Sequence, residues 1–234
     1  MFDHVTIRVS DRPASRRFYG LALGEPSYEG DEFVEWDAFS IAEDAEPTRR
    51  LHVAFGSPEP AAVDAWWRRL VDAGYESDGE PGPRPQYDES YYGAFVLDPD
   101  GNSVESVHHD RSLLGGIDHL WLRTRDVSAI KRCYDVLAPL VGIERAHDTP
   151  GGVRFRGGGR SFTFVAGDEP TERVHLAFPA PDRATVDEFH RVALAAGYRD
   201  NGAPGERPRY HAGYYGAFVL DPDGHNVEAV FHDR

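Results

Sequence analysis

Three polar residues of metal-ligating type recur inside apolar, strand-like segments at two places in the chain. They are His4, His52 and Glu105, and then His119, His175 and Glu228. Two imidazoles and one carboxylate form 2-His-1-carboxylate sites, which bind Fe, Zn, Ni or Mn and leave coordination positions open for a substrate. A single histidine in a strand is more often a structural, hydrogen-bonded residue than a ligand. The metal hypothesis therefore depends on all three residue types occurring together.

The alternation of residues in these segments indicates which way the side chains point. In HVTIRV, the side chains of Val5, Ile7 and Val9 share one face, and His4 lies on the opposite face. His52 lies opposite the aliphatic side chains of RLHVAF in the same way. If the sheet curls, this second face becomes a concave and partly polar interior, in which two imidazoles and a carboxylate can meet.

The chain is an internal repeat. The run YYGAFVLDPDG begins at residue 91 and again at residue 214, an offset of 123 residues that also relates RLHVAF to RVHLAF and RPQY to RPRY. Near the start of each half FDHVTIRV pairs with IDHLWLRT, and the offset there is 115 residues. The second half thus carries about eight extra residues, which we expect in GGVRFRGGGRS. The repeat predicts two domains, 1–112 and 113–234. Because duplication copies structural and functional residues alike, recurrence alone adds little support to the metal hypothesis.

Each half is itself predicted to contain two smaller units. A strand pattern, FDHVTIRVS, precedes a helix pattern for which Asp11 is the expected N-cap. After two short strand candidates the order restarts with RLHVAF, a helix that Gly74 ends, and a hairpin across DPDG. The DPDG turn places Glu105 and Glu228 four residues beyond its glycine. Strands cluster after each helix instead of alternating with helices, which favours an α+β fold of four βαβββ units over a doubly wound sheet.

Composition restricts the partners. The formal net charge is −15 at pH 7, which disfavours nucleic acid and anionic membrane surfaces as partners. A single cysteine, Cys133, excludes an internal disulfide, and we expect a reducing, cytoplasmic location. The first residues lack the pattern of a signal peptide, and no apolar run of about 18 residues is present. The expected partner is a small-molecule substrate, and the expected state is a monomer or homodimer.

These motifs together resemble those of a known family. Paired βαβββ units with DH in a first strand, H in the next unit's first strand, and DPDGNxVE or DPDGHNVE near the end resemble the vicinal oxygen chelate superfamily. This group includes glyoxalase I, bleomycin resistance proteins and extradiol dioxygenases. The resemblance covers nearly the whole chain and implies two tandem glyoxalase-like domains whose curved mixed sheets form cup-shaped cavities. It also implies a divalent metal ion that holds two neighbouring substrate oxygens, with ligands at the six positions given above.

The resemblance to extradiol dioxygenases is incomplete. That branch has a histidine and then a tyrosine ahead of D-P-x-G, whereas this chain has Phe95 and Phe218 at the tyrosine position. The histidine position holds Asp88 in the first half and His211 in the second. Ring cleavage is therefore disfavoured, and the second half is the better catalytic candidate. We expect Glu228 and His211 to be its catalytic residues, although His211 can equally be a solvent-exposed loop residue.

Two further histidines have two interpretations. His109 and His232 lie four residues beyond the glutamates. They are either partners of the metal ligands or polar residues at a strand end, and we favour the second interpretation.

Duplication leaves open which units close on one another. If each half closes on itself, one site combines His4, His52 and Glu105, and the other site combines His119, His175 and Glu228. If units are exchanged, His4 joins His175 and Glu228, and His119 joins His52 and Glu105. Both arrangements give two histidines and one glutamate. Connections within a half are short, so we expect closure within each half.

The leading functional hypothesis is a metal-dependent lyase, isomerase or dioxygenase that acts on a small oxygen-rich or aromatic metabolite. The alternative is a metal-free protein that binds and sequesters an antibiotic-like compound. A third possibility is that one half is catalytic and the other is structural. Aromatic residues of the second half, Phe155, Phe162 and Phe164 among them, either wall an apolar pocket or pack in the core.

Overall fold

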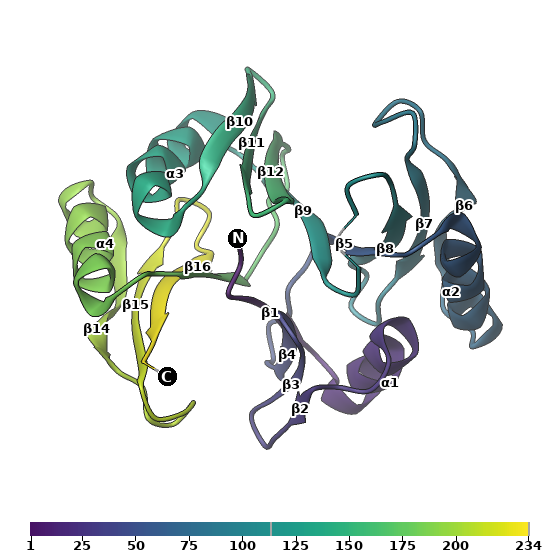
Figure 1. Ribbon diagram of the computed structural model, residues 1–234, viewed down its shortest axis with the longest axis horizontal. Helices are drawn as coiled ribbons and strands as arrows, with labels where there is room; N and C mark the ends of the chain where they lie inside the picture. The colour runs from purple at the N-terminus through teal and green to yellow at the C-terminus, as the bar shows by residue number, and fades with distance from the viewer. Residues whose placement is uncertain (113, 234) are drawn as a thin grey trace. The chain divides into compact units, whose positions relative to one another are not determined.

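The computed structural model describes residues 1–112 and 114–233, so Leu113, where the second domain is predicted to begin, and Arg234 lie outside the described residues. The order strand, helix and three strands occurs four times along the chain (Figure 1), which confirms the α+β class and the four βαβββ units. The first two units comprise β1 (His4–Val9), α1 (Arg12–Leu23), β2 (Tyr28–Glu29), β3 (Phe33–Trp36), β4 (Phe39–Glu43), β5 (His52–Gly56), α2 (Pro60–Asp72), β6 (Ser77–Pro83), β7 (Tyr92–Leu97) and β8 (Ser103–His108). The last two comprise β9 (Ile117–Thr124), α3 (Val127–Val141), β10 (Glu144–Thr149), β11 (Gly152–Gly157), β12 (Arg160–Ala166), β13 (Val174–Pro179), α4 (Arg183–Ala195), β14 (Arg199–Glu206), β15 (Tyr214–Leu220) and β16 (Asn226–His232).

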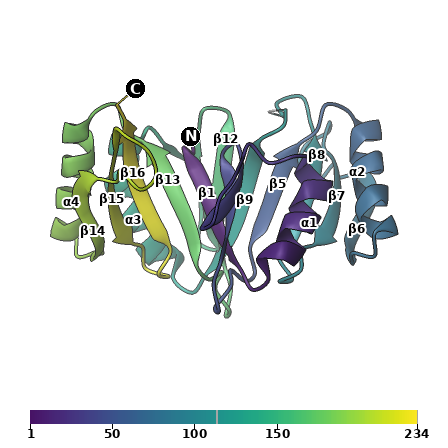
Figure 2. The ribbon, with the colours of Figure 1, turned by 90° about the horizontal axis from the view of Figure 1, so that it is seen from below.

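The chain folds into two compact units, and neither coincides with one sequence repeat. The first unit consists of residues 7–122, and the second consists of residues 1–6 together with residues 123–234. In the second unit β1 lies beside β13 (Figure 2), and the Asp3 N–H donates to the carbonyl of Ala177 over 2.9 Å. In the first unit β5 pairs with β9, with Ala54 opposite His119. The expected closure of each half on itself is therefore wrong. The domain boundaries 1–112 and 113–234 follow the sequence repeat and stay a prediction.

Both units contain the same arrangement of five adjacent strands. In the first unit the order is β9-β5-β8-β7-β6, and in the second it is β1-β13-β16-β15-β14. β5 runs parallel to β8, which carries Glu105, so that Glu105 lies opposite Ala54. In the same way β13 runs parallel to β16, and Glu228 lies opposite Ala177. Each set of three candidate ligands therefore comes from three neighbouring strands.

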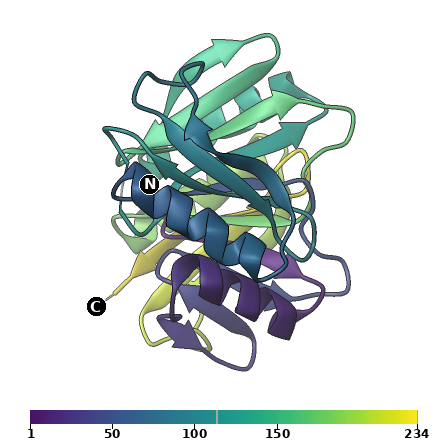
Figure 3. The same cartoon turned by 90° about the vertical axis from the view of Figure 1, so that its right-hand side faces the viewer.

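The helices form where the sequence patterns predict them. Asp11 caps α1 by accepting from the Ala14 N–H, as expected, and Gly74 follows α2 with a φ of 93°. On α2, Val63, Trp66 and Leu70 are buried. Figure 3 shows α1 and α2 side by side, and the Trp66 indole N–H donates to the carbonyl of Ala22 at the end of α1. These contacts pack the two helices of the first unit against each other, while α1 covers β4 and α2 covers β7.

The glycine-rich insertion of the second half is ordinary hairpin structure. GGVRFRGGGRS contains all of β11 and the start of β12, and the extra residues are also divided among longer versions of α3 and β10. Phe155, Phe162 and Phe164 are fully buried around Tyr134, so these rings are core residues and do not wall a pocket. Within the described residues, no helix is both long and apolar enough to cross a membrane.

Candidate metal centres

Six predicted ligands meet in two clusters of three. The first triad is His52, Glu105 and His119, and it lies within residues 7–122. The second triad is His4, His175 and Glu228, and it lies in the unit formed by residues 1–6 and 123–234. In each triad the candidate ligand atoms all lie within 4.8 Å of one another. The grouping is the exchanged arrangement, in which each triad takes one histidine from the other sequence repeat.

The ligand atoms in the first triad are spaced as the ligands of one ion are. Nε2 of His52 is 3.0 Å from Oε2 of Glu105 and 3.3 Å from Nε2 of His119. Nε2 of His119 is 3.5 Å from the same glutamate oxygen. Ligands bound at about 2.1 Å to a single tetrahedral or octahedral ion are separated by roughly 3 to 3.5 Å. The observed spacing is therefore suitable for one divalent ion.

The hydrogen-bond partners of the first triad fix where its protons are. The Ser103 hydroxyl donates to Asp78 over 2.7 Å, so its oxygen accepts from Nδ1 of His52, which is 3.2 Å away. Nδ1 of His119 donates to Asp118 over 2.9 Å. A neutral imidazole has only one N–H, so both Nε2 atoms carry lone pairs. With both rings neutral, two imidazole nitrogens and a buried carboxylate oxygen thus face one another as acceptors, and this arrangement suits a cation between them.

The second triad has the same geometry. Nε2 of His175 lies 3.0 Å from both Oε2 of Glu228 and Nε2 of His4. Nδ1 of His4 donates to Asp3, whereas Nδ1 of His175 accepts from the Asn226 side-chain NH2 over 2.6 Å. Glu228 is fully buried, and no described residue donates an aligned hydrogen bond to its Oε2, although His175 is close. A buried carboxylate loses several kcal/mol of hydration, so this site also fits a divalent cation.

A tyrosine holds the other oxygen of each glutamate. The hydroxyls of Tyr91 and Tyr214 donate to Oε1 of Glu105 and Glu228, respectively, both over 2.7 Å. Burial, together with the neighbouring carboxylate, raises the pKa of each tyrosine far above its ordinary value, so both remain donors. Each glutamate is thereby fixed with Oε1 occupied and Oε2 directed at the histidines. Sequence reasoning missed both tyrosines, although they belong to the repeated run YYGAFVLDPDG.

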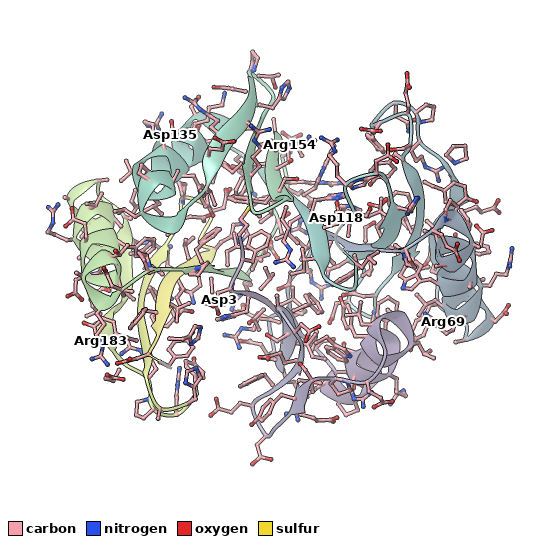
Figure 4. All side chains as sticks on the ribbon, in the orientation of Figure 1. Asp3, Arg69, Asp118, Asp135, Arg154 and Arg183 are labelled. Carbon is pink, nitrogen blue, oxygen red and sulfur yellow. The ribbon has the colours of Figure 1, made fainter. Side chains whose placement is uncertain are left out.

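An aspartate orients the first-strand histidine of each triad. Asp3 and Asp118 (labelled in Figure 4) precede His4 and His119 in the sequence and accept from their Nδ1 atoms over 2.9 Å. Burial by itself raises the pKa of Asp3, but hydrogen bonds from His4 and His232 outweigh it and hold the pKa below its ordinary value. The same balance, with His109 and His119 as donors, lowers the pKa of Asp118. Both aspartates therefore stay charged and fix the ring orientation of a ligand.

The other two predicted histidines belong to this outer layer. His232 contacts Asp3 through Nε2 at 2.9 Å, and His109 contacts Asp118 at 3.1 Å. His232 ends β16 and His109 follows β8, so both lie at a strand end as favoured, and each also contacts the aspartate that orients a triad histidine. His211 is half-buried, with its Nε2 at 2.9 Å from Nδ1 of His232, and Asp88 instead binds Ser90 and Arg111. The Asp-His dipeptide, present at the start of both repeats, was the signal for the two aspartates.

Comparisons with known proteins identify the family. The model of the Glyoxalase/Bleomycin resistance protein/Dioxygenase superfamily matches residues 1–106 and 116–229. Among solved structures, glyoxalase I from Zea mays is similar with a TM-score of 0.69 and 18% sequence identity, over 99% of this chain and 92% of that chain. A protein of Bacillus subtilis subsp. subtilis str. 168, provisionally assigned as a dioxygenase, has a TM-score of 0.67 and 16% identity, over 100% of this chain and 85% of that chain.

At these sequence identities the solved structures support the shared fold only. Membership of the family rests on the match to the family model. None of the curated proteins with which the sequence was compared matches it. Because the family model covers most of both repeats, the protein belongs to the glyoxalase, bleomycin resistance protein and dioxygenase superfamily.

Proposed function

We propose that this protein is a metal-dependent enzyme in which each triad holds one divalent ion and acts on a small oxygen-rich or aromatic metabolite. The observation that carries this proposal is the meeting of three hydrogen-bond acceptors in the first triad, at separations of 3.0–3.5 Å. A protein that only sequesters an apolar compound has no need for such an arrangement, because buried acceptors without a cation are destabilising.

The residues of each triad would bind the ion through Nε2 of two histidines and Oε2 of the glutamate. When bound, the ion supplies Lewis-acid polarisation of two neighbouring substrate oxygens and holds the substrate in place. The protein's own contribution is orientation, because the tyrosine and the aspartate of each site fix one ligand each. Two protein nitrogens and one oxygen leave further coordination positions for the substrate.

The surroundings of the triads support the proposed substrate class. The Phe95 ring lies 5.7 Å from the His52 ring, and the Arg84 guanidinium lies over the same phenyl ring at 5.7 Å. In the second unit Phe218 and Arg207 repeat this arrangement beside His175. An aromatic surface with a cation near a metal site suits a small, oxygen-rich or aromatic anion. Because phenylalanine stands where extradiol dioxygenases have tyrosine, a lyase or isomerase reaction is favoured over ring cleavage.

Metal analysis tests this function. We expect protein purified without chelators to contain close to two equivalents of divalent metal per chain, and His175→Ala/Glu228→Ala to retain one. A screen of 2-oxo aldehydes, hydroxy acids and catechols, with and without chelator, then identifies the reaction. Absence of stoichiometric metal, combined with unchanged ligand binding in the double variant, would support the alternative of a metal-free binding protein. The small-molecule partner, the monomeric or homodimeric state and the cytoplasmic location remain predictions.

A further inference from the structure

The outer layers of the two triads differ in one respect, which is the number of protons they need. In the second unit a chain of polar groups leads outward from His4 through Asp3 and His232 to His211. The segment of this chain formed by His232 and His211 lies between two hydrogen-bond acceptors. The Asp3 carboxylate faces Nε2 of His232 at 2.9 Å, and the carbonyl of Ala212 faces Nδ1 of His211 at 2.8 Å.

Between these two acceptors lie two imidazoles in contact with each other. Nδ1 of His232 is 2.9 Å from Nε2 of His211, and the rings are stacked, with centroids 5.0 Å apart. The three contacts, carboxylate to ring, ring to ring and ring to carbonyl, each need one N–H. Two neutral imidazoles supply only two. All three hydrogen bonds form only when the pair carries one additional proton.

The corresponding chain in the first unit is complete without an additional proton. Nε2 of His109 donates to Asp118, and Nδ1 of His109 accepts from the backbone N–H of Arg111 over 3.1 Å. A single neutral imidazole satisfies both contacts. Asp88, at the repeat position of His211, accepts hydrogen bonds from Ser90 and from the Arg111 guanidinium.

We propose that His211 and His232 share one excess proton, and that this pair is a proton donor joined to the second triad and lacking in the first. The groups around the pair are suited to a positive charge. Asp3 faces it from the N-terminal segment, and the Tyr214 ring contacts both imidazoles at 5.4 and 5.1 Å. Negative charge and an aromatic ring both stabilise an imidazolium. The Arg209 guanidinium, two residues before His211 in the sequence, donates to the Tyr210 hydroxyl.

The inference rests on the proposed function for its chemical role. A substrate oxygen that becomes anionic beside the second triad can take the proton from the pair. The pair then becomes neutral, no electrons are transferred, and water returns a proton through the half-buried His211. The first triad has no such donor, so the two sites, identical in their ligands, are predicted to differ in reaction.

Nitrogen NMR of the metal-free full chain, labelled with 15N-histidine, counts the protons directly. Near neutral pH we expect three of the four ring nitrogens of His211 and His232 to be protonated, against one of two in His109. The variants His211→Asn and His109→Asn assign the signals. Two protonated nitrogens in the pair would overturn the proposal, whatever the metal experiments show, because this count needs neither metal nor substrate.

A second variant tests whether the proton is shared. In His211→Asn, His232 should keep a proton only on Nε2, where it donates to Asp3, and the excess proton should be lost. The matched variant Asp88→Asn, at the same repeat position, should leave the protonation of His109 unchanged. If His232 stays doubly protonated without His211, the excess proton belongs to His232 and Asp3 alone, and sharing is disproved.

Discussion

At the scale of single residues, each proposed metal ligand has a second contact that sets its direction. His52 is held by Ser103, His119 by Asp118, and Glu105 by Tyr91. The three ligand types and their positions could be predicted from the sequence, because they are polar residues on apolar strands. The tyrosines could not, since a tyrosine in a strand is ordinary core material until its hydroxyl is seen to meet a carboxylate.

Removing the hydroxyl that holds a glutamate is expected to weaken metal binding. Tyr214→Phe frees Oε1 of Glu228 to rotate, and loss of such an outer contact reduces metal affinity by roughly 10- to 100-fold. Calorimetric titration of the metal-free variant with Zn²⁺ or Ni²⁺ measures this loss, which should affect one site only. Tyr215→Phe is the matched control, because the Tyr215 hydroxyl donates to Asp187 on α4. Equal affinities in both variants would mean that Tyr214 has no part in binding.

The aspartate that orients a ligand histidine is expected to have a similar effect. Asp118→Ala removes the acceptor of His119 Nδ1 and also the partner of His109. Metal affinity of the first triad should fall by about 10- to 100-fold, while the second triad keeps its affinity. Asp110→Ala, an exposed aspartate nearby in the sequence, is the control. Competition with a chromogenic chelator resolves the two sites, and a loss at both would contradict the assignment.

At the scale of elements, the repeated YYGAF strand and the DPDG turn both serve the glutamate strand. The hairpin register places Phe95 opposite Glu105 and Phe218 opposite Glu228. The glycine of YYGAF leaves the space that the carboxylate occupies, because a Cβ at Gly93 or Gly216 would lie 2.4 or 2.5 Å from Oε1 of the glutamate. The identical letters of the two repeats are thus explained by the support they give to a ligand, as well as by the turn they form.

A methyl group at this glycine is expected to displace the ligand. In Gly216→Ala the added Cβ would also lie 3.2 Å from the Tyr214 ring, so both the glutamate and its tyrosine must move. We expect at least tenfold weaker metal binding at the second triad, because a displaced ligand has an effect like that of losing a contact that orients it. Gly151→Ala is the control, since a Cβ there meets no atom within 4 Å. A crystal structure of the variant with unmoved Glu228 would contradict this explanation.

The DPDG turns are fixed to the preceding units by a buried hydrogen bond. Tyr19 on α1 donates to Asp98 over 2.9 Å, and burial raises the pKa of this aspartate. Tyr19→Phe removes a donor from a buried carboxylate and should lower the free energy of unfolding by about 1 to 3 kcal/mol. Urea unfolding measures this change, and Tyr28→Phe, which alters a half-exposed ring, should leave stability nearly unchanged.

The pH dependence of this loss follows from the direction of the shift. Because the pKa of Asp98 is raised on folding, the native state binds a proton more readily than the unfolded state. The contribution of Asp98 to the free energy of unfolding therefore falls as pH rises from the ordinary carboxyl pKa to the raised pKa. Acidification restores this contribution. The difference between wild type and Tyr19→Phe should accordingly shrink at acidic pH. A difference that grows on acidification would contradict a charged Asp98.

At the scale of the whole molecule, each triad takes ligands from both sequence repeats. His4 belongs to the first repeat but lies with His175 and Glu228, and His119 belongs to the second but lies with His52 and Glu105. Because both triads consist of two histidines and one glutamate, the residue types alone do not show which histidine belongs to which triad. The pairing can be tested by combining substitutions.

Double variants distinguish exchange from closure within each repeat. His4→Ala/Glu228→Ala removes two ligands of one triad, so one of the two metal equivalents should remain. His4→Ala/Glu105→Ala removes one ligand from each triad, so both sites should lose metal. Metal analysis after gel filtration gives the two stoichiometries, and circular dichroism checks that the variants fold. The reverse result would mean that each repeat closes on itself.

The sequence by itself determined the duplication, the four βαβββ units, the superfamily resemblance and the six ligand types, because these depend on local periodicity, turn residues and spacing. Only the tertiary structure decided which strands become neighbours. β1 lies beside β13, and β9 pairs with β5, so each first-strand histidine meets the ligands of the other repeat. Local patterns are the same for either pairing. Which strands pair depends on hydrogen bonds between strands that are distant in the chain. The same long-range contacts bring His232 into contact with both Asp3 and His211.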